Sequence, residues 1–276
     1  MKTSLFLMAS MLICSILNAQ GDSISIPRES RFLVSIYGGP SFAVGKFAEY
    51  QTINSAEQNN IKGFNNFNLA GAADLGYAVG VNVSYGITKR FAIGINVEHA
   101  SNKTGEVQYP ELYYPISGLP GSEKSYDSEN WKSTNFFLMP KYTLPFRKWE
   151  LAFMLKVGIQ TASSPVTKMV IETIAIDPFN GNDKNILTYN QPSLKDLAIA
   201  YGFGLEGRFA LSKRIKFVIN CNYATANHSF SSGAELEYQS KTVSLGSTNT
   251  RNYKVPFNFK KQFSTITPGI GINFKI

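Results

Sequence analysis

The chain has 276 residues, of which 43% are hydrophobic, 13% aromatic and 17% charged. Soluble domains carry about 25% charged residues, so this sequence is poor in charge and rich in aromatic side chains. Beyond the N-terminal segment, no apolar run approaches the roughly 18–20 residues that a membrane helix requires, which excludes a helical membrane protein. Two cysteines and two histidines leave little material for a zinc centre, a disulfide scaffold or a histidine relay.

The N-terminal residues have the features of a secretory signal peptide. Lys2 supplies a positive charge, an apolar stretch runs from Leu5 to Leu17, and Ala19 is a small residue at a suitable cleavage position. We therefore predict that residues 1–19 direct export and that residues 20–276 form the mature domain. The mature chain would keep Cys221 as its sole cysteine, so no intramolecular disulfide is expected.

Period-two alternation recurs along the chain and predicts β-strands. In the clearest case, apolar or aromatic residues occupy every odd position from Leu75 to Tyr85, with Gly, Ala, Asn and Ser between them. The pattern recurs near residues 91–97, 149–160, 197–208, 215–223 and 266–274, and two less regular stretches at 32–42 and 135–144 bring the predicted strands to eight. Strands of about 9–11 residues suit a tilted membrane crossing.

The connections between these strands fall into two classes of length. Three are short (residues 86–90, 145–148 and 210–214), and four are long and polar (about 43–70, 100–130, 161–196 and 224–262). Short turns at one end and long loops at the other are typical of bacterial outer-membrane barrels, and a sheet in a bilayer must close because hydrocarbon cannot satisfy an open edge. We predict an all-β fold: an eight-stranded antiparallel up-and-down transmembrane β-barrel with three short periplasmic turns and four long extracellular loops.

Aromatic residues flank the predicted short turns at one inferred level. Aromatic residues flank turns in many soluble β-proteins too, but so many at one level favour the girdle that lies at a membrane interface. The predicted girdle consists of Tyr85, Phe91, Tyr142, Trp149, Phe209, Phe217 and Phe274.

The inward-facing row of each strand carries the charged residues. An eight-stranded barrel is just wide enough for side chains to fill it, and unpaired interior charges are costly, so we predict ion pairing and a plugged polar lumen. Glu98 and Lys156 lie at similar heights above their short turns and are predicted to share one network. The predicted lumenal charges are Asp74, Glu98, Glu150, Lys156, Glu206, Arg208, Lys216 and Lys275.

Four stretches of the sequence resemble a known family. Residues 80–105 combine a strand, a Thr-Lys-Arg turn and a strand ending in Ser-Asn-Lys-Thr-Gly, residues 135–142 look like a Pro-bearing fourth strand, and residues 196–209 and 269–276 also fit. These stretches resemble the PorT-like small outer-membrane β-barrel family, which has the architecture of the OmpA transmembrane domain and OmpX. The resemblance implies an outer-membrane location, insertion by the barrel-assembly machinery and a link to secretion, but no particular activity.

One pair of residues raises the question of enzymatic activity. His99 and Ser101 share a face near the end of a predicted strand, and they resemble the His/Ser pair of outer-membrane lipid A deacylases, where histidine is the general base and serine the nucleophile. Glu106 or Glu111 would have to orient His99. A polar strand end that leaves the membrane explains the same residues, so no catalytic residue is predicted and the pair is kept only as a candidate.

No cofactor, metal or nucleic acid is predicted. The run from Gly202 to Gly207 spells a dinucleotide fingerprint, but it lies inside a predicted strand and no helix follows it. His99 and His228 lack the spacing of metal ligands. The chain has 27 Lys+Arg and 19 Asp+Glu, but its basic residues are not gathered into a stripe of the kind that binds nucleic acid.

The predicted partners follow from the location. Lys254, Lys260 and Lys261 lie near the predicted outer rim, where they would meet lipopolysaccharide or simply be solvated. The other partners are outer-membrane lipid, the assembly machinery and an unknown protein bound by the loops. We predict a structural or interaction role; the alternatives are a small passive channel and a lipid A-modifying hydrolase. The alternative fold is a soluble lipocalin-type barrel, which would place the apolar rows inside.

Overall fold

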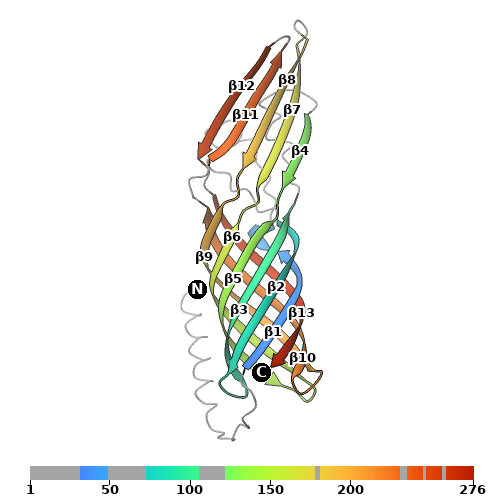
Figure 1. Cartoon of the computed structure of the whole chain (residues 1–276), viewed down its shortest axis with the longest axis vertical. Helices are drawn as coiled ribbons and strands as arrows, with labels where there is room; N and C mark the ends of the chain where they lie inside the picture. Colours follow the sequence, from blue (N-terminus) through green and yellow to red (C-terminus); the bar gives the residue numbers. More distant parts are fainter. Residues whose placement is uncertain are drawn as a thin grey trace.

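The computed structural model describes residues 32–48, 73–105, 122–177, 181–230, 235–244, 247–256 and 259–276. These residues form two antiparallel sheets (Figure 1). One sheet closes into a barrel, and the other is built from strands that lie within the long connections. In this part of the chain, no helix is long and apolar enough to span a membrane. The predicted signal peptide, residues 1–19, lies outside the described residues.

The closed sheet confirms the predicted all-β, eight-stranded antiparallel barrel. Its strand order is β1-β13-β10-β9-β6-β5-β3-β2, and β1 pairs with both β2 and β13, so the barrel has no open edge. The strands are β1 (Phe32–Ala43), β2 (Ala73–Gly86), β3 (Phe91–Thr104), β5 (Trp131–Pro145), β6 (Trp149–Ser163), β9 (Lys195–Ala210), β10 (Ile215–Phe230) and β13 (Phe259–Lys275).

The two ends of the barrel differ in their connections. At one end, which we call the turn end, residues 87–90, 146–148 and 211–214 join consecutive strands, and the C-terminus also lies there (Figure 1). At the opposite end, the loop end, the first long connection contains the 3-10 helix η2 (Gly45–Phe47). The other three contain strands that the sequence had predicted as parts of loops.

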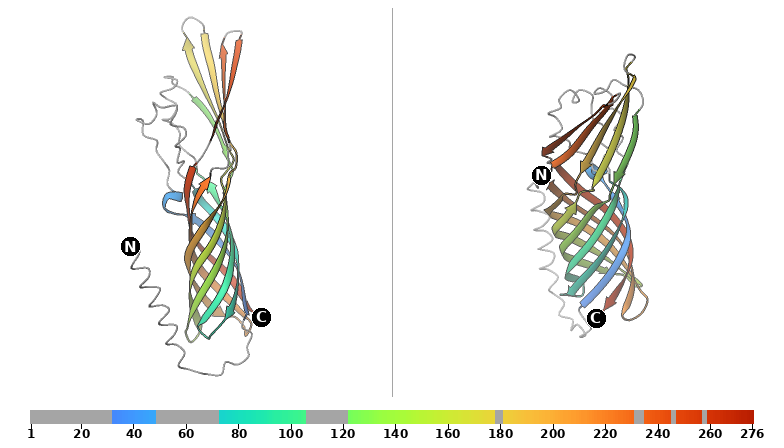
Figure 2. Two further views of the ribbon diagram at one scale, coloured as in Figure 1. Left: turned by 90° about the vertical axis from the view of Figure 1, so that its left-hand side faces the viewer. Right: turned by 45° about the horizontal axis from the view of Figure 1, so that its top comes forward.

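These additional strands form a second sheet, which we call the loop sheet. It extends away from the loop end of the barrel (Figure 2). Its order is β12-β11-β8-β7-β4, so hydrogen bonds join strands that come from three different connections. The strands are β4 (Ser122–Ser128), β7 (Thr167–Asp177), β8 (Gly181–Gln191), β11 (Glu235–Ser244) and β12 (Ser247–Pro256).

Alternate residues of the barrel strands have opposite environments, as the pleat of a strand requires. In β6, the side chains of Phe153, Leu155 and Val157 are 44%, 55% and 53% exposed. Met154 and Lys156, which lie between them, are 2% and 3% exposed. The apolar row therefore faces outward and the mixed polar row faces inward. This contradicts the lipocalin-type alternative, because that fold would bury the apolar row.

A β-bulge interrupts this alternation at the start of β2. Ala73 pairs with Thr104 and Gly76 with Asn102, so two residues of β2 oppose one residue of β3. Asp74 lies inside the bulge and is exposed, and its carboxylate accepts a hydrogen bond from the backbone N–H of Leu75 at 2.7 Å. The prediction that Asp74 belongs to the lumenal charges is therefore wrong, because the extra residue turns it away from the interior.

Candidate functional site

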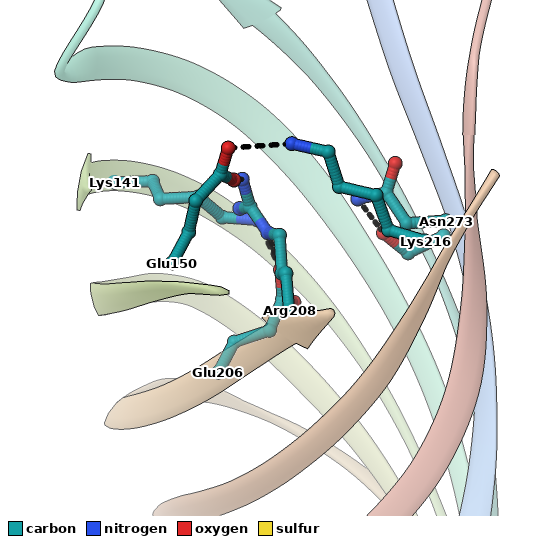
Figure 3. Close-up of polar contacts among 7 residues, drawn as sticks. Lys141, Glu150, Glu206, Arg208, Lys216 and Asn273 are labelled. Carbon is teal, nitrogen blue, oxygen red and sulfur yellow. Dashed lines mark hydrogen bonds and ion pairs between the residues drawn. The ribbon is translucent and has the colours of Figure 1, made fainter. Parts of the chain in front are cut away.

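The interior near the turn end contains a network of ion pairs (Figure 3). Oε1 of Glu206 in β9 accepts hydrogen bonds from Nζ of Lys141 in β5, at 3.3 Å, and from Nε of Arg208. Nη1 of Arg208 lies 3.4 Å from Oε2 of Glu150 in β6. Oε1 of Glu150 lies 2.5 Å from Nζ of Lys216 in β10. The network therefore joins four strands that are neighbours in the barrel wall, β5, β6, β9 and β10.

The burial of this network increases with distance from the turn end. Glu150 and Lys216 have side chains that are 29% and 24% exposed, whereas those of Glu206, Lys141 and Arg208 are 0%, 1% and 3% exposed. Charges far from water interact strongly, and an unpaired one is costly. Glu206 is consequently the centre of the network, since it is the carboxylate shared by the two deeply buried cations.

A second interior network surrounds Glu98 in β3. The hydroxyl of Tyr37 donates to Oε2 of Glu98 at 2.7 Å, and Nδ2 of Asn96 donates to Oη of Tyr37 at 2.9 Å. Asn96 also donates to Oδ1 of Asn82 at 2.6 Å. Nζ of Lys156 lies 4.0 Å from the same Glu98 oxygen. The structure thus brings Glu98 and Lys156 together from opposite sides of the intervening strand β5.

Aromatic rings complete this second network. Nζ of Lys156 lies 5.7 Å from the ring centroid of Phe137, a cation–π distance. The Tyr37 ring crosses the neighbouring strand at Gly80, where an added Cβ would lie only 2.4 Å from Cζ of Tyr37. Glycine at position 80 is therefore required by the approach of a ring rather than by its own backbone conformation.

Each charged residue of the two networks has an opposite charge within 4.0 Å. Four cations share three carboxylates, so every interior charge has an opposite neighbour, which limits the cost of burying it. The cations are Lys141, Lys156, Arg208 and Lys216, and the anions are Glu98, Glu150 and Glu206.

Four aromatic side chains gather in the interior at the loop end, and we call them the aromatic cap. Phe47 of η2, Trp131 of β5, Phe230 of β10 and Phe263 of β13 are 1%, 5%, 0% and 2% exposed. The Phe263 ring stacks on Phe47 with centroids 4.4 Å apart and meets Trp131 edge-on at 5.2 Å. The backbone N–H of Val44 donates to the carbonyl of Ser264 at 2.9 Å, which holds η2 against β13.

His228 lies beside the cap and is 2% exposed. Its Nδ1 is 3.0 Å from Oδ2 of Asp196, and its Nε2 is 2.8 Å from Oε1 of Gln160. Its ring meets Phe263 edge-on, with centroids 5.0 Å apart. Because both ring nitrogens have protein partners, His228 links β6, β9 and β10 beneath the cap. Among the described residues, no group of three or more His, Cys, Asp or Glu side chains could hold a metal ion.

The residues of the predicted girdle lie on the outward side near the turn end. Trp149 is paired with Phe209, which is in turn paired with Phe217, and Phe91 is paired with Tyr142. The rings of Trp149 and Phe209 are stacked at 6.3 Å. Of the two remaining girdle positions, Tyr85 packs on Phe32 at 5.0 Å and Phe274 is 38% exposed.

The candidate catalytic pair has other hydrogen-bond partners. Nδ1 of the half-buried His99 is 3.0 Å from Oγ1 of Thr134 in β5. The hydroxyl of Ser101, 3% exposed, accepts a hydrogen bond from Nδ2 of Asn130 at 3.2 Å. Both contacts are made toward the β5 side of β3 rather than between the two residues. The carboxylates considered as a third member, residues 106 and 111, lie outside the described part of the chain.

The lysines predicted to meet lipopolysaccharide have separate environments. Lys260 is exposed at the start of β13. Lys261 is 7% exposed and is paired with His228, so it lies on the inward row, and the prediction that it contacts lipopolysaccharide is wrong. Lys254 belongs to β12, and its side chain lies outside the described structure. At the turn end, the half-buried Lys275 donates its backbone N–H to the carbonyl of Arg214 at 2.9 Å.

Sequence reasoning missed Lys141, Tyr37 and His228 as interior residues. A signal for Lys141 was present, because the odd positions from Asn135 to Lys141 are all buried and continue one alternating row. Lys141 was missed because its neighbours in that row, Phe137 and Met139, are large and apolar. For Tyr37 and His228, the partners come from distant strands, and no spacing in the sequence indicates them.

Comparison with known proteins identifies similar folds at low identity. No protein-family model matches the sequence, and no curated protein matches it. The chain is similar to Neisserial surface protein A (9% identity, 91% of this chain and 100% of that chain, TM-score 0.42). It is also similar to Ail, the attachment invasion locus protein of Yersinia pestis, with 13% identity over 89% of this chain and 99% of that chain and a TM-score of 0.38. A third similar structure is a major outer membrane protein from Thermus thermophilus, with 11% identity over 88% of this chain and 98% of that chain and a TM-score of 0.40. Likeness at this level gives no information about activity.

Proposed function

We propose that this chain is a bacterial outer-membrane β-barrel that does not conduct solutes and that acts as an interaction protein through its loop sheet. The observation that carries the proposal is the apolar row that every barrel strand presents outward. One residue from each strand is between 41% and 61% exposed: Ile36, Val81, Ile95, Leu138, Leu155, Phe203, Ile219 and Ile270. An apolar belt around a whole closed sheet is unsuited to water and suited to hydrocarbon.

The proposal includes export and a link to secretion. The signal peptide predicted at residues 1–19 supports export, and the resemblance to PorT-like barrels supports outer-membrane insertion and a role near a secretion assembly. The girdle at the turn end would then lie at the periplasmic interface, and the loop sheet would stand outside the cell.

The arrangement of the interior supports a barrel closed to solutes. The two ion-pair networks occupy the turn-end half and the middle, and the aromatic cap occupies the loop end. A hydrated ion would have to displace both paired charges and packed rings. We therefore place the activity on the loop sheet, which is the part of the described structure that extends beyond the barrel.

Cys221 provides a direct test of the membrane location. It is exposed on the outward row of β10, between Ile219 and Tyr223. In intact outer membranes we expect Cys221 to resist a membrane-impermeant maleimide and to react after unfolding in SDS. Cys placed at the exposed position Asn190 of the loop sheet, in a Cys221→Ser background, is the control and should react at once. Rapid native labelling of Cys221 would contradict the proposal.

The alternatives are tested by transport and by lipid analysis. Reconstituted protein should give no single-channel conductance in planar bilayers and no liposome swelling with small sugars. Cells that carry His99→Ala or Ser101→Ala should keep the same lipid A acyl pattern by mass spectrometry. Steady conductance would support the passive channel, and a changed acyl pattern would support the hydrolase.

A further inference from the structure

The three short turns at the turn end share one sequence pattern. Each begins with an apolar residue and ends with two basic residues: Ile-Thr-Lys-Arg at 87–90, Phe-Arg-Lys at 146–148 and Leu-Ser-Lys-Arg at 211–214. All of these residues are exposed. The fold therefore brings three basic pairs, which lie far apart in the sequence, to one end of the barrel (Figure 1). The six cations are Lys89, Arg90, Arg147, Lys148, Lys213 and Arg214.

Hydrogen bonds give the first and third of these turns the same geometry. In the first turn, two consecutive backbone N–H groups donate to the carbonyl of Phe91 at 2.9 and 3.0 Å, and the hydroxyl of Thr88 accepts from two further backbone N–H groups. In the third turn, the carbonyl of Ile215 and the hydroxyl of Ser212 accept in the same way, with both carbonyl distances at 3.0 Å. The two turns therefore present their basic pairs from the same backbone geometry.

The positive charge of this end is not balanced by acidic residues. In the described part of the chain, none of the six cations forms an ion pair. Glu150 follows the second turn, but it is already bound to Arg208 and Lys216 in the barrel interior. A carboxylate at Ile276 would offset one charge. Six cations less one carboxylate leave an excess of five positive charges on the described turn end.

An exposed apolar residue accompanies each basic pair. Ile87, Phe146 and Leu211 are 47%, 48% and 67% exposed. The ring of Phe146 stacks on that of Trp149 with centroids 4.3 Å apart, so the second turn is continuous with the aromatic girdle. Cations beside apolar and aromatic side chains at one level are typical of a surface that meets both the headgroups and the acyl chains of lipids.

We propose that the turn end binds the headgroups of anionic phospholipids in the leaflet that surrounds it. Basic clusters at a membrane surface attract anionic lipids, and each Lys or Arg near such a surface strengthens binding by about fivefold. Arg supplies paired hydrogen-bond donors for a phosphate, and Lys supplies a compact charge. This inference rests on the proposed function, because it requires the turn end to lie at a membrane interface.

The distribution of the cations favours lipid molecules over an acidic protein. A protein interface has one continuous patch with an apolar centre and a polar rim. Here the three turns join β2 to β3, β5 to β6 and β9 to β10, which are successive pairs of neighbours in the barrel, so the basic pairs are spaced around its rim. Each pair has its own apolar neighbour. Each turn can therefore hold a separate lipid molecule.

Quenching of Trp149 fluorescence by brominated lipids tests the inference. The chain has two tryptophans, so a Trp131→Phe background leaves Trp149 as the reporter beside Arg147 and Lys148. The full-length protein is reconstituted in phosphatidylcholine vesicles that contain equal mole fractions of brominated phosphatidylglycerol or brominated phosphatidylcholine. At low salt we expect the anionic lipid to bind near Trp149 about threefold more strongly or better, and we expect this preference to fall as salt rises.

Matched variants separate a local site from a general effect of charge. Arg147→Gln with Lys148→Gln should remove most of the preference measured at Trp149. The control, Lys132→Gln with Lys195→Gln, removes the same charge from exposed residues at the loop end and should leave the preference unchanged. Heat-dependent migration in SDS gels shows whether each variant keeps a folded barrel.

Several results would overturn the inference. Equal binding of the two lipids would do so, as would a preference that survives Arg147→Gln with Lys148→Gln in a folded barrel. Poly-glutamate that binds the protein in zwitterionic micelles, without any lipid preference, would assign the cations to an acidic polypeptide. Loss of the preference in inorganic phosphate, but not in sodium chloride of equal ionic strength, would assign them to a free anion. In each case slow labelling of Cys221 would leave the proposed membrane function standing, whereas rapid labelling would remove it.

Discussion

The ion-pair network near the turn end and the aromatic cap at the loop end occupy the same barrel interior by different physical means. In the network, Glu206 is fully buried and its geometry is specific, because one oxygen serves both Lys141 and Arg208. In the cap, Phe263 is equally buried but contacts other rings at centroid distances of 4.4–6.1 Å without a directional bond.

This difference determines how each region tolerates substitution. Removing one member of a buried ion pair leaves its partner charged in a poorly solvated place, so even an isosteric replacement is expensive. Removing a ring from an apolar cluster costs mainly contact area and cavity volume, so another large apolar side chain restores most of the stability. The two regions therefore predict opposite outcomes for conservative substitutions.

The largest effect is expected for Glu206→Gln. This variant keeps the side-chain volume but leaves Lys141 without a carboxylate partner among the contacts described above, and we expect a loss of about 3–5 kcal/mol in the free energy of unfolding. Urea unfolding in lipid vesicles, followed by tryptophan fluorescence, measures it. Glu150→Gln, which is 29% exposed, is the control and should cost much less. Recovery of stability in the double variant Glu206→Gln, Lys141→Met would show that the unpaired Lys141 causes the loss. Equal losses in Glu206→Gln and Glu150→Gln would contradict this explanation.

The aromatic cap should respond to volume rather than to chemistry. Phe263→Ala should cost about 3 kcal/mol, and Phe263→Leu less than about 1.5 kcal/mol, because leucine fills most of the space. The same urea unfolding measures both. In a Trp149→Phe background, quenching of Trp131 by acrylamide should rise for the alanine variant and stay low for the leucine variant. Similar losses of unfolding free energy in the alanine and leucine variants would show that the cap, like the ion-pair network, does not tolerate a conservative substitution.

Gly80→Ala tests the second network, where the ring of Tyr37 packs over Gly80 and its hydroxyl donates to Glu98. The new methyl group would collide with the Tyr37 ring, so we expect a loss of about 1–3 kcal/mol. In a Tyr37→Leu background, the same substitution should cost little, giving a coupling energy of about 1 kcal/mol or more in a double-mutant cycle. Gly207→Ala is the control, because the nearest atom to its added Cβ would lie at 3.7 Å. Additive costs would show that the ring is not the obstacle.

The smallest effect is expected for an ion pair outside the barrel interior. Lys132 and Glu129 are 3.7 Å apart, and their side chains are 53% and 58% exposed. Water screens such a pair, so Lys132→Gln should change the unfolding free energy by less than about 0.5 kcal/mol. A loss as large as that of Glu206→Gln would mean that burial does not set the strength of these pairs.

Much of the barrel could be predicted from the sequence, because a strand between lipid and a polar interior must alternate with period two. The outward row Phe153–Leu155–Val157 and the inward Lys156 follow from that period alone. The outward position of Asp74 could not be predicted in this way, because a single extra residue in the bulge exchanges the inward and outward positions at the start of β2. The pairing of Lys141 with Glu206 also did not follow, because it depends on how β5, β6 and β9 are staggered.

The loop sheet was not predictable by the same reasoning. In β7, Val170 and Ile171 are adjacent, as are Ile174, Ala175 and Ile176, so the strand has no clear alternation. β12 is rich in Asn, Thr and Ser, a composition typical of turns. The order of the sheet depends on cross-strand register, which pairs strands of three different connections that have no common spacing in the sequence.

The discontinuous origin of the loop sheet has a consequence for immune recognition. Its five strands come from three separate connections, and no connection supplies more than two of them. A synthetic peptide copied from any one connection would therefore lack the neighbours that define the surface. Antibodies raised against such peptides should recognise the denatured chain, whereas antibodies raised against the folded protein should require the assembled epitope.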